Sequence, residues 1–167
     1  MRAGIALGSN IEPRLLNLQT ARRRIFALHS GNVPVACSKV YETSPVDCAP
    51  GTSPFLNAVL EITSDLPPEI LHQRLQAIER ELGRPESHER NSPRTIDLDL
   101  LYCASLIHHS PTLTLPHPRI AQRQFVLMPL CDIRPTLILP NFTQNIEQLS
   151  RACSSAESLN VYCETIY

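Results

Sequence analysis

Several features typical of other protein classes are scarce or missing in this sequence of 167 residues. The six cysteines include no C-x-x-C pair, which argues against a zinc site and against the disulfide framework of a small secreted scaffold. No apolar run approaches the length of a membrane span, and the N-terminal apolar segment, residues 3–7, is too short for a signal peptide. We therefore expect a cytoplasmic protein without a membrane-embedded part.

Net charge is nearly absent as well. The chain has 15 Lys and Arg residues against 16 Asp and Glu residues, a formal net charge of −1. Such a balance does not attract nucleic acid or a membrane surface by bulk electrostatics, so an anionic ligand must be held by a local group of cations. Glycine is scarce, with 5 residues against 15 prolines, which favours stiff loops over flexible linkers. The length suits a single domain over residues 1–167, which we expect to be monomeric.

The hydrophobic pattern predicts alternating strands and helices. The expected strands are residues 3–7, 33–41, 55–62 and the acidic segment 93–101, and the expected helices follow Asn10, as N-cap, and Leu66. The resulting order is strand, helix, strand, strand, helix, strand. This order predicts an α+β protein with the ferredoxin-like βαββαβ plan, in which helices pack on one face of an antiparallel sheet.

A C-terminal extension follows this core. Two short apolar pieces, residues 106–107 and 112–115, could pair as a hairpin, and residues 120–133 have a helical pattern. Residues 145–149 suggest a further short helix. The tail after about residue 150 gives no clear pattern, so we expect the core and the hairpin-and-helix extension to account for the fold.

The acidic segment, residues 93–101, carries the strongest functional signal. Asp97 and Asp99 interrupt an otherwise apolar and β-branched run, and they share one face because side chains alternate along a strand. Two neighbouring carboxylates repel each other, so the pattern indicates a divalent metal or an arginine between them. The alternative is an edge strand with a solvated acidic face.

Cations and planar side chains elsewhere in the chain could complete a site. The candidate cations are Arg84, Arg90, Arg94, His117, Arg119 and Arg123. Phosphoryl transfer needs a magnesium ion, held by one or two carboxylates and completed by phosphate oxygens and water, together with positioned cations. Phe55 and Phe125 could sandwich a flat heterocycle anchored by Asn57, although such rings are more often core residues. The residues alone describe a nucleotide-dependent transferase acting on a planar substrate that they do not name.

Six motifs occur in the order found in one enzyme family. They are residues 8–10, 41–45 and 55–59, Glu79 with Gly83 and Arg84, residues 93–101, and residues 115–119 with 123–127. In these motifs the chain resembles 6-hydroxymethyl-7,8-dihydropterin pyrophosphokinase of folate biosynthesis, from the first strand to about residue 135. Members of that family transfer the terminal pyrophosphoryl group of ATP to the hydroxymethyl group of the pterin and release AMP.

The resemblance implies roles for individual residues. Asp97 and Asp99 would bind two magnesium ions and form the catalytic set together with Arg84 and Arg94, which would lie in mobile loops. The residues implied in pterin binding are Thr43, Ser44, Val46, Phe55, Asn57 and Phe125. The residues implied in ATP binding are Gln76, Glu79, Leu100, Thr114, His117 and Arg123. The implied partners are therefore two small molecules.

The chain departs from the family pattern in three places. Glu86 stands where many relatives have a second arginine, Asn91 and Ser92 where some have Trp-Gly, and Ala121 where some have a basic or imidazole side chain. We expect the loss of cations there to weaken charge neutralisation of the triphosphate, while activity is retained. No family role is carried over to these positions.

Two other functions are compatible with the residues themselves. Paired carboxylates on a ferredoxin-like sheet also suit two-metal nucleotidyl transfer at an α-phosphate. A ligand-binding or interaction domain would instead use them as a solvated face. The sequence does not identify a general base for the pyrophosphoryl transfer, for which Asp97 and a metal-bound water are the candidates.

Overall fold

The computed structural model describes residues 1–45, 51–84, 93–154 and 158–166. The elements that it contains are β1 (Arg2–Ser9), α1 (Arg14–Phe26), β2 (Ala36–Cys37), β3 (Val40–Thr43), β4 (Phe55–Thr63), α2 (Pro68–Glu81), β5 (Asp97–Cys103), β6 (His108–His109), β7 (Thr114–Leu115), the 3-10 helix η1 (Ile120–Gln122), α3 (Gln124–Ile133), α4 (Ile146–Ala152) and β8 (Leu159–Cys163). Within these residues, none of the helices is both long and apolar enough to cross a membrane.

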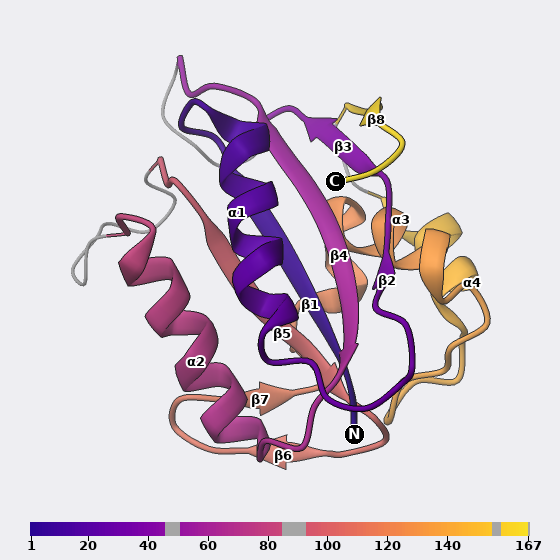
Figure 1. The fold of residues 1–167 in the computed structure, drawn as a ribbon. Helices are drawn as coiled ribbons and strands as arrows, with labels where there is room; N and C mark the ends of the chain where they lie inside the picture. The colour runs from indigo at the N-terminus through magenta and orange to yellow at the C-terminus, as the bar shows by residue number, and fades with distance from the viewer. Residues whose placement is uncertain (46–50, 85–92, 155–157, 167) are drawn as a thin grey trace.

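The main sheet has the strand order β5-β1-β4-β3-β8, with β2 beside β4 (Figure 1). Every neighbouring pair of strands in it is antiparallel. The part β5-β1-β4-β3 is the order that two split βαβ units produce, because each helix connects two strands that have a third strand between them. The predicted ferredoxin-like core is confirmed.

One face of the sheet packs against α1 and α2. Ile5 and Leu7 of β1 meet Leu18 and Ile25 of α1 and Leu75 of α2 in one buried cluster. The helical residues recur at the spacing of an amphipathic helix, and the strand residues recur at every second position, so each element turns one apolar side to this cluster. Each of these side chains contributes about 1.5–3 kcal/mol by its burial.

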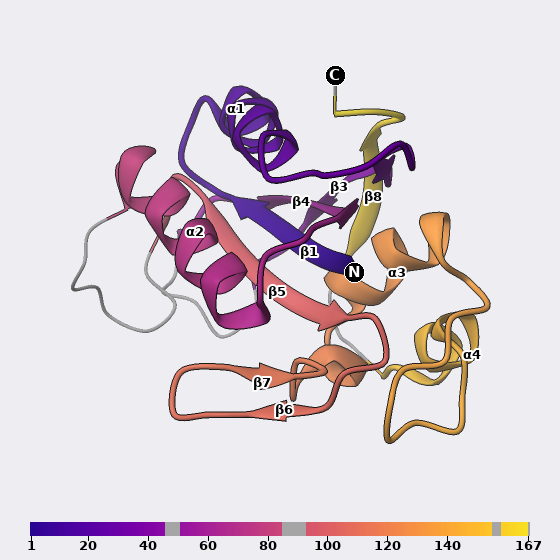
Figure 2. The same cartoon turned by 60° about the horizontal axis from the view of Figure 1, so that its bottom comes forward.

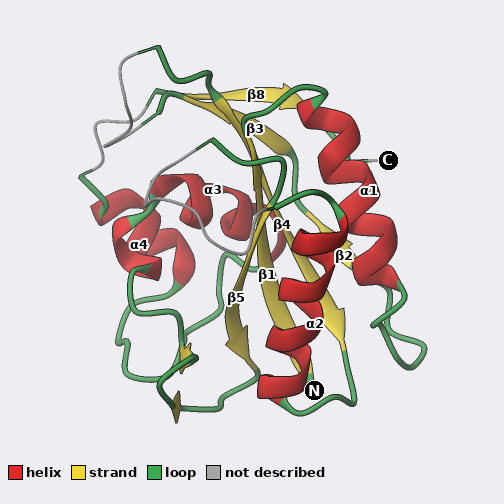
Figure 3. Ribbon diagram, turned by 90° about the vertical axis from the view of Figure 1, so that its left-hand side faces the viewer, coloured by secondary structure: helices red, strands yellow, loops and turns green. Residues whose placement is uncertain are grey.

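The opposite face is covered as well, by α3 and α4 (Figure 3). Val59 of β4 and Leu101 of β5 pack there against Leu127, Leu130 and Ile146. The two core helices thus lie on one face, as expected, and the helices of the C-terminal extension cover the other. Both faces can be covered because β4 is buried at seven consecutive positions and so presents apolar side chains to both.

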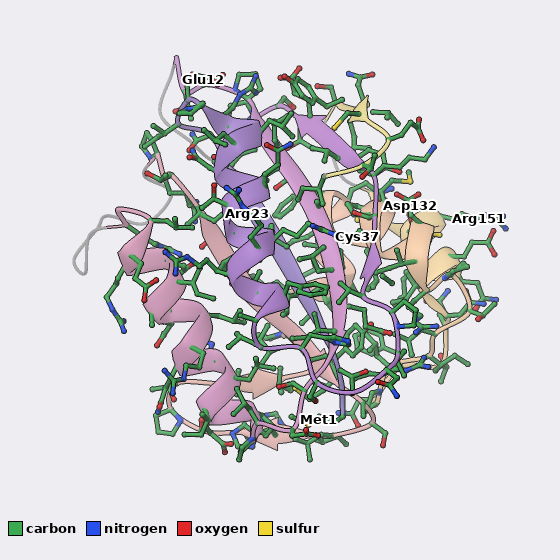
Figure 4. The ribbon with its side chains drawn as sticks, in the orientation of Figure 1. Met1, Glu12, Arg23, Cys37, Asp132 and Arg151 are labelled. Carbon is green, nitrogen blue, oxygen red and sulfur yellow. The ribbon has the colours of Figure 1, made fainter. Side chains whose placement is uncertain are left out.

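Two predicted elements are interrupted. The expected strand at residues 33–41 is divided into β2 and β3, because the hydroxyl of Ser38 accepts a hydrogen bond from the Val59 N–H at 2.8 Å and the Lys39 N–H donates to Asp132 at 3.1 Å. Figure 4 labels Asp132 on α3, beside this part of the chain. The expected helix at residues 120–133 is likewise divided into η1 and α3, since Arg123 between them is extended.

The C-terminal extension contains more structure than the sequence predicts. The expected hairpin is present beside β5, but its first strand is β6 at residues 108–109 and not at the predicted residues 106–107; β6 pairs with β7 (Figure 2). Asn145 caps α4 through a capping box with Gln148, which confirms the short helix near residues 145–149. The tail supplies β8, which pairs with β3 and extends the sheet at that edge.

Candidate active site

Three residues in register form a row across the sheet near the turn after β1. Gly8 of β1 pairs with Asn57 of β4 on one side and with Asp97 of β5 on the other. The row lies on the face of α3, since Leu7 and Leu98, one position along, point into the cluster with α1 and α2. A Cβ at Gly8 would be 3.2 Å from the Asn57 Oδ1 atom and 3.9 Å from the Asp97 Cβ atom. Glycine therefore leaves the space between the Asn57 and Asp97 side chains unfilled.

The paired carboxylates lie on this face, as predicted, and arginines hold both of them. Asp97 accepts hydrogen bonds from Arg84 and from Arg94, the latter at 2.7 Å. Asp99 accepts one from Arg123 at 2.8 Å. The side chains of Asp97 and Asp99 are 26% and 35% exposed, so water and ligands reach both anions. Three guanidinium groups from three separate segments thus surround two accessible carboxylates.

This donor set fits a magnesium ion that a phosphate ligand completes. Magnesium is usually held by one or two carboxylates plus substrate phosphates and water, and not by a closed cage of protein ligands. Asp97 and Asp99 supply the two carboxylates. Across the described ranges, no group of three or more His, Cys, Asp or Glu side chains could hold a metal by itself. The residues present therefore suit a cation that arrives with a polyphosphate.

Two of these arginines also lie over aromatic rings. The Arg94 guanidinium carbon is 5.6 Å from the centre of the Phe55 ring, and that of Arg123 is 5.5 Å from the centre of the Phe125 ring. Both distances are within the range of cation–π attraction. Each arginine therefore connects one carboxylate with one ring. The rings proposed to hold a planar substrate lie directly beside the acidic pair.

The remaining residues implied in pterin binding lie on neighbouring strands. Asn57 donates a hydrogen bond from Nδ2 to the hydroxyl of Thr43 at 2.7 Å, and both residues are buried. This contact fixes the orientation of the Asn57 amide, whose Oδ1 atom then points toward Gly8. Ser44 exchanges hydrogen bonds with Ser158, just before β8. Val46 lies outside the described residues.

Glu79 of α2 forms a hydrogen bond to the backbone of the acidic strand. Its Oε1 atom accepts a hydrogen bond from the Leu98 N–H at 2.7 Å and another from Arg84. Burial raises the pKa of Glu79 to about 7, against the hydrogen bonds from Leu98 and Arg84 that lower it. In this structure its carboxylate faces β5 and Arg84, while its implied role in ATP binding stays a prediction.

Two of the other residues implied in ATP binding, Leu100 and His117, lie at the outer edge of β5. The Leu98 N–H points outward to Glu79, so the backbone of Leu100, two residues on, points outward too. The Leu100 side chain is buried in the core, which leaves its backbone as the part that a ligand can reach. The His117 N–H donates to the Leu101 carbonyl at 2.8 Å, and burial lowers the pKa of His117.

Two elements border this edge. α2, which contains Gln76, and β7, which contains Thr114, both contact β5. The Gln76 side chain is within 3.2 Å of His72, one helical turn earlier. Outward backbone groups between polar side chains suit recognition of a flat base by one donor and one acceptor. The nucleotide subsite that the resemblance implies at this edge stays a prediction.

Asn10 is a site neighbour that the sequence analysis misassigned. It is not the N-cap of α1, because Pro13 takes that position without a side-chain hydrogen bond. Its Oδ1 atom instead accepts a hydrogen bond from the Arg94 N–H. No local pattern reveals this contact, since the two residues are 84 positions apart in the chain.

None of the departures from the family pattern is among the residues placed in the candidate site above. Glu86, Arg90, Asn91 and Ser92 are outside the described residues. Ala121 packs against the apolar cluster beneath α3. The site as described therefore draws its positive charge from Arg84, Arg94 and Arg123.

Comparison with known proteins identifies relatives of this chain. The family model for 7,8-dihydro-6-hydroxymethylpterin-pyrophosphokinase (HPPK) matches residues 4–135. The 2-amino-4-hydroxy-6-hydroxymethyldihydropteridine pyrophosphokinase of Haemophilus influenzae is 38% identical over 140 residues, which cover 83% of this chain and 85% of the relative. The protein of the same name from Synechocystis is 37% identical over 147 residues, 88% of this chain and 73% of the relative. Among longer relatives, the folic acid synthesis protein of Dictyostelium discoideum is 36% identical, and this chain spans only 20% of it.

Solved structures with low sequence identity share the fold. A crystal structure titled HPPK-DHPS in complex with substrates superposes with a TM-score of 0.67 at 14% identity, covering 90% of this chain and 43% of that one. A triple mutant of Plasmodium falciparum HPPK-DHPS superposes with a TM-score of 0.70, also at 14% identity, over 90% of this chain and 43% of that one. At this identity the superpositions support the fold alone.

Proposed function

The chain belongs to the 7,8-dihydro-6-hydroxymethylpterin-pyrophosphokinase family, and we propose that it transfers pyrophosphate from ATP to the hydroxymethyl group of 6-hydroxymethyl-7,8-dihydropterin, a step of folate biosynthesis. One observation supports this reaction at this site above others. Asp97 and Asp99 share one face, and the arginines that hold them lie over Phe55 and Phe125. Charge for a polyphosphate and flat surfaces for a heterocycle are thus side by side.

The reaction is an in-line displacement at the β-phosphorus of ATP. The pterin hydroxyl oxygen forms the new bond to that phosphorus, the bond from the β-phosphorus to the oxygen bridging it to the α-phosphorus breaks, and AMP leaves with that oxygen. The hydroxyl proton is released. Because such transition states spread negative charge over the transferred group, catalysis consists mainly of positioning and electrostatic stabilisation.

Different residues of the chain contribute to positioning and to electrostatic stabilisation. Arg84, Arg94 and Arg123 can turn from the carboxylates to the phosphate oxygens and stabilise their charge, while Phe55 and Phe125 orient the pterin ring. Asp97 and Asp99 would hold two magnesium ions, which supply electrostatic stabilisation of the triphosphate and of the attacking hydroxyl. The outward backbone of Leu100 would receive the adenine ring.

A single assay tests the proposed reaction. The protein is incubated with ATP, magnesium chloride and 6-hydroxymethyl-7,8-dihydropterin, and the products are separated by chromatography. AMP and the pterin diphosphate in equal amounts support the proposal. Pyrophosphate with an adenylated pterin would assign the site to nucleotidyl transfer, and magnesium-independent ATP binding without turnover would assign it to a binding domain. Chelation by EDTA should stop AMP formation, and added magnesium should restore it.

The proposed partners are the two small-molecule substrates. We propose that a single domain acts as a monomer in the cytoplasm, where its co-substrate ATP is plentiful, and that it takes no nucleic-acid partner, consistent with the net charge of −1. Sedimentation analysis tests the oligomeric state, since a dimer would sediment with about twice the monomer mass of 18.7 kDa.

A further inference from the structure

Asn10 lies in the turn between β1 and α1 and binds the backbone of Arg94 twice. Its own N–H donates to the Arg94 carbonyl at 3.2 Å, and its Oδ1 atom accepts from the Arg94 N–H at 2.8 Å. Two hydrogen bonds from one residue to the same partner fix both the position and the direction of that partner's backbone. The start of the acidic strand is thereby tied to the end of β1.

Arg94 needs such an anchor to make its own contacts. Its guanidinium group binds the Asp97 carboxylate at 2.7 Å and lies 5.6 Å from the centre of the Phe55 ring. A long side chain loses considerable rotamer freedom in such a contact, and a mobile backbone would add to that loss. With the backbone held at Asn10, only the side chain must move when a ligand takes over the guanidinium group.

The chemistry of this position also favours asparagine. Asn10 is only 4% exposed, and within the described residues its Nδ2 atom is buried without a hydrogen-bond partner. An unpaired buried donor is costly, so stability alone does not explain the amide. An aspartate would supply the same acceptor, but it would place a third carboxylate beside the acidic pair.

We propose that Asn10 is a positioning residue of the transfer reaction, which acts by holding the Arg94 backbone so that the guanidinium group can move between Asp97, Phe55 and the phosphates. The inference rests on the proposed function. It assigns Asn10 no contact with the reacting atoms. Its effect on the rate therefore passes entirely through Arg94.

Asn17 offers a matched control in the same turn. Its Nδ2 atom donates to the Ile11 carbonyl at 2.8 Å and to the Ser9 hydroxyl at 3.3 Å. It thus holds this turn from the α1 side, and it has no hydrogen bond to those residues of the candidate site that the structure describes. A variant of Asn17 shows what loosening the turn does by itself.

The kinetic experiment compares Asn10→Ala, Asn17→Ala, Arg94→Ala and the Asn10→Ala/Arg94→Ala double variant by AMP formation. We expect Asn10→Ala to lower kcat by about 10–100-fold, the usual range for a residue that orients a catalytic group, with the KM for ATP changed less than about 3-fold. Asn17→Ala should keep kcat within about 3-fold of the wild-type value. In the Arg94→Ala background, Asn10→Ala should cause no further loss. An equal loss in both backgrounds, or an Asn17→Ala variant as slow as Asn10→Ala, would overturn the proposal.

A second measurement tests the hydrogen bonds between Asn10 and the Arg94 backbone in the absence of turnover. Amide hydrogen exchange by NMR on the ligand-free protein should show that the Arg94 N–H is protected in the wild type and in Asn17→Ala and exchanges at least about 10-fold faster in Asn10→Ala. Should Asn10→Ala fail to fold, Asn10→Asp replaces it, and its retained acceptor should keep the Arg94 N–H protected. Unchanged protection in Asn10→Ala, or lost protection in Asn10→Asp, would overturn the anchor. A wild-type protein that forms no AMP would reject the proposed function, while the exchange data still decide about the anchor.

Discussion

Two rows of residues cross the same face of the sheet at its opposite ends, and they share one layout. The open row is Asn57, Gly8 and Asp97, and the closed row is Glu61, Gly4 and Tyr102, with one residue each on β4, β1 and β5. In Figure 4, the labelled Glu12 lies near the end of the sheet that carries the open row, and the labelled Met1 lies near the end that carries the closed row. Both rows have a polar residue on β4 and a glycine in the middle.

The rows differ in what covers the central glycine. The Tyr102 ring lies so close over Gly4 that an added Cβ would be 2.2 Å from its Cε1 atom, and its hydroxyl donates to Glu61 at 2.6 Å. Arg134 completes the closed row, and the Glu61 side chain is 6% exposed. In the open row, no ring among the described residues covers Gly8 in this way, and Asp97 stays accessible. The same layout thus gives a structural anchor where the glycine is covered and an accessible candidate site where it is open.

The largest contrast should come from removing the open-row carboxylate. Asp97→Ala should lower AMP formation by about 10³-fold or more, equivalent to at least about 4 kcal/mol of barrier, because the anionic ligand for metal and arginine is lost. The free energy of unfolding should change by less than about 1 kcal/mol, since these ion pairs are partly exposed. Rate assays and urea denaturation test both parts. A nearly wild-type rate would rule out the metal-binding role of Asp97.

The closed row should respond in the opposite way. Glu61→Ala should lower the free energy of unfolding by about 3 kcal/mol, because Arg134 and the Tyr102 hydroxyl lose their buried partner. The kcat of the folded fraction should stay within about 3-fold of the wild-type value, since Glu61 lies at the far end of the sheet. Urea denaturation and AMP formation at low temperature measure the two quantities. A stable but inactive variant would contradict the separation of the rows.

The two glycines sharpen the comparison further. Gly4→Ala should cost about 2 kcal/mol of unfolding free energy, because its Cβ overlaps the Tyr102 ring and the ring must shift. Gly8→Ala places its Cβ 3.2 Å from the Asn57 Oδ1 atom and should cost less than about 1 kcal/mol. It should instead raise the KM for the pterin several-fold. Thermal denaturation of the two variants side by side would refute the comparison if their losses were equal.

The smallest expected effect is a difference in how Glu79 and Glu61 make the stability of the protein depend on pH. Burial raises the pKa of Glu79, beside the open row, to about 7 from 4.5. Between about pH 4.5 and 7 the folded state then binds more protons than the unfolded state, so the Glu79 contribution to stability is full below pH 4.5 and is lost as pH rises to 7. Glu79→Gln should remove this slope from the unfolding free energy measured across that window. An unchanged slope in Glu79→Gln would show that other groups cause it.

Glu61 in the closed row should titrate in the opposite sense. Burial raises its pKa, but hydrogen bonds from Arg134 and Tyr102 outweigh burial and hold it below the ordinary value of 4.5. Its stabilising contribution is therefore present above pH 4.5 and is lost as pH falls through its lowered pKa. Glu61→Gln should accordingly flatten the acid side of the same stability profile, and it serves as the control for Glu79→Gln.

The strands and the acidic pair were predictable because they depend on local patterns. Alternation alone places Asp97 and Asp99 on one face, and the split βαβ order follows from the succession of elements. The pairing of Glu61 with Tyr102 and Arg134 is different, because it requires strand order, register and the packing of α3. The anchor between Asn10 and Arg94 depends in the same way on which strands are neighbours.

The C-terminal part was harder to predict for another reason. α3 and α4 pack on a sheet face whose apolar side chains are spread over β4 and β5. The pattern of any single segment therefore does not predict that helices cover both faces of the sheet. β8 joins the sheet through pairing with β3, although its own side chains are mostly exposed. An exposed strand of this kind has little of the alternation by which strands are recognised.

The outer edge of β5 has a consequence for self-association. An edge strand exposes backbone groups to which another chain can add a strand, and growth of this kind leads to aggregation. On either side of Leu100, outward backbone groups are already bound: Leu98 by the Glu79 side chain and Leu101 by the His117 backbone. An incoming strand needs several successive outward groups, whereas a single aromatic ring needs one donor and one acceptor. The bound groups of β5 thus discourage the continuation of its sheet into a second molecule, while the proposed adenine ring would need only the backbone of Leu100.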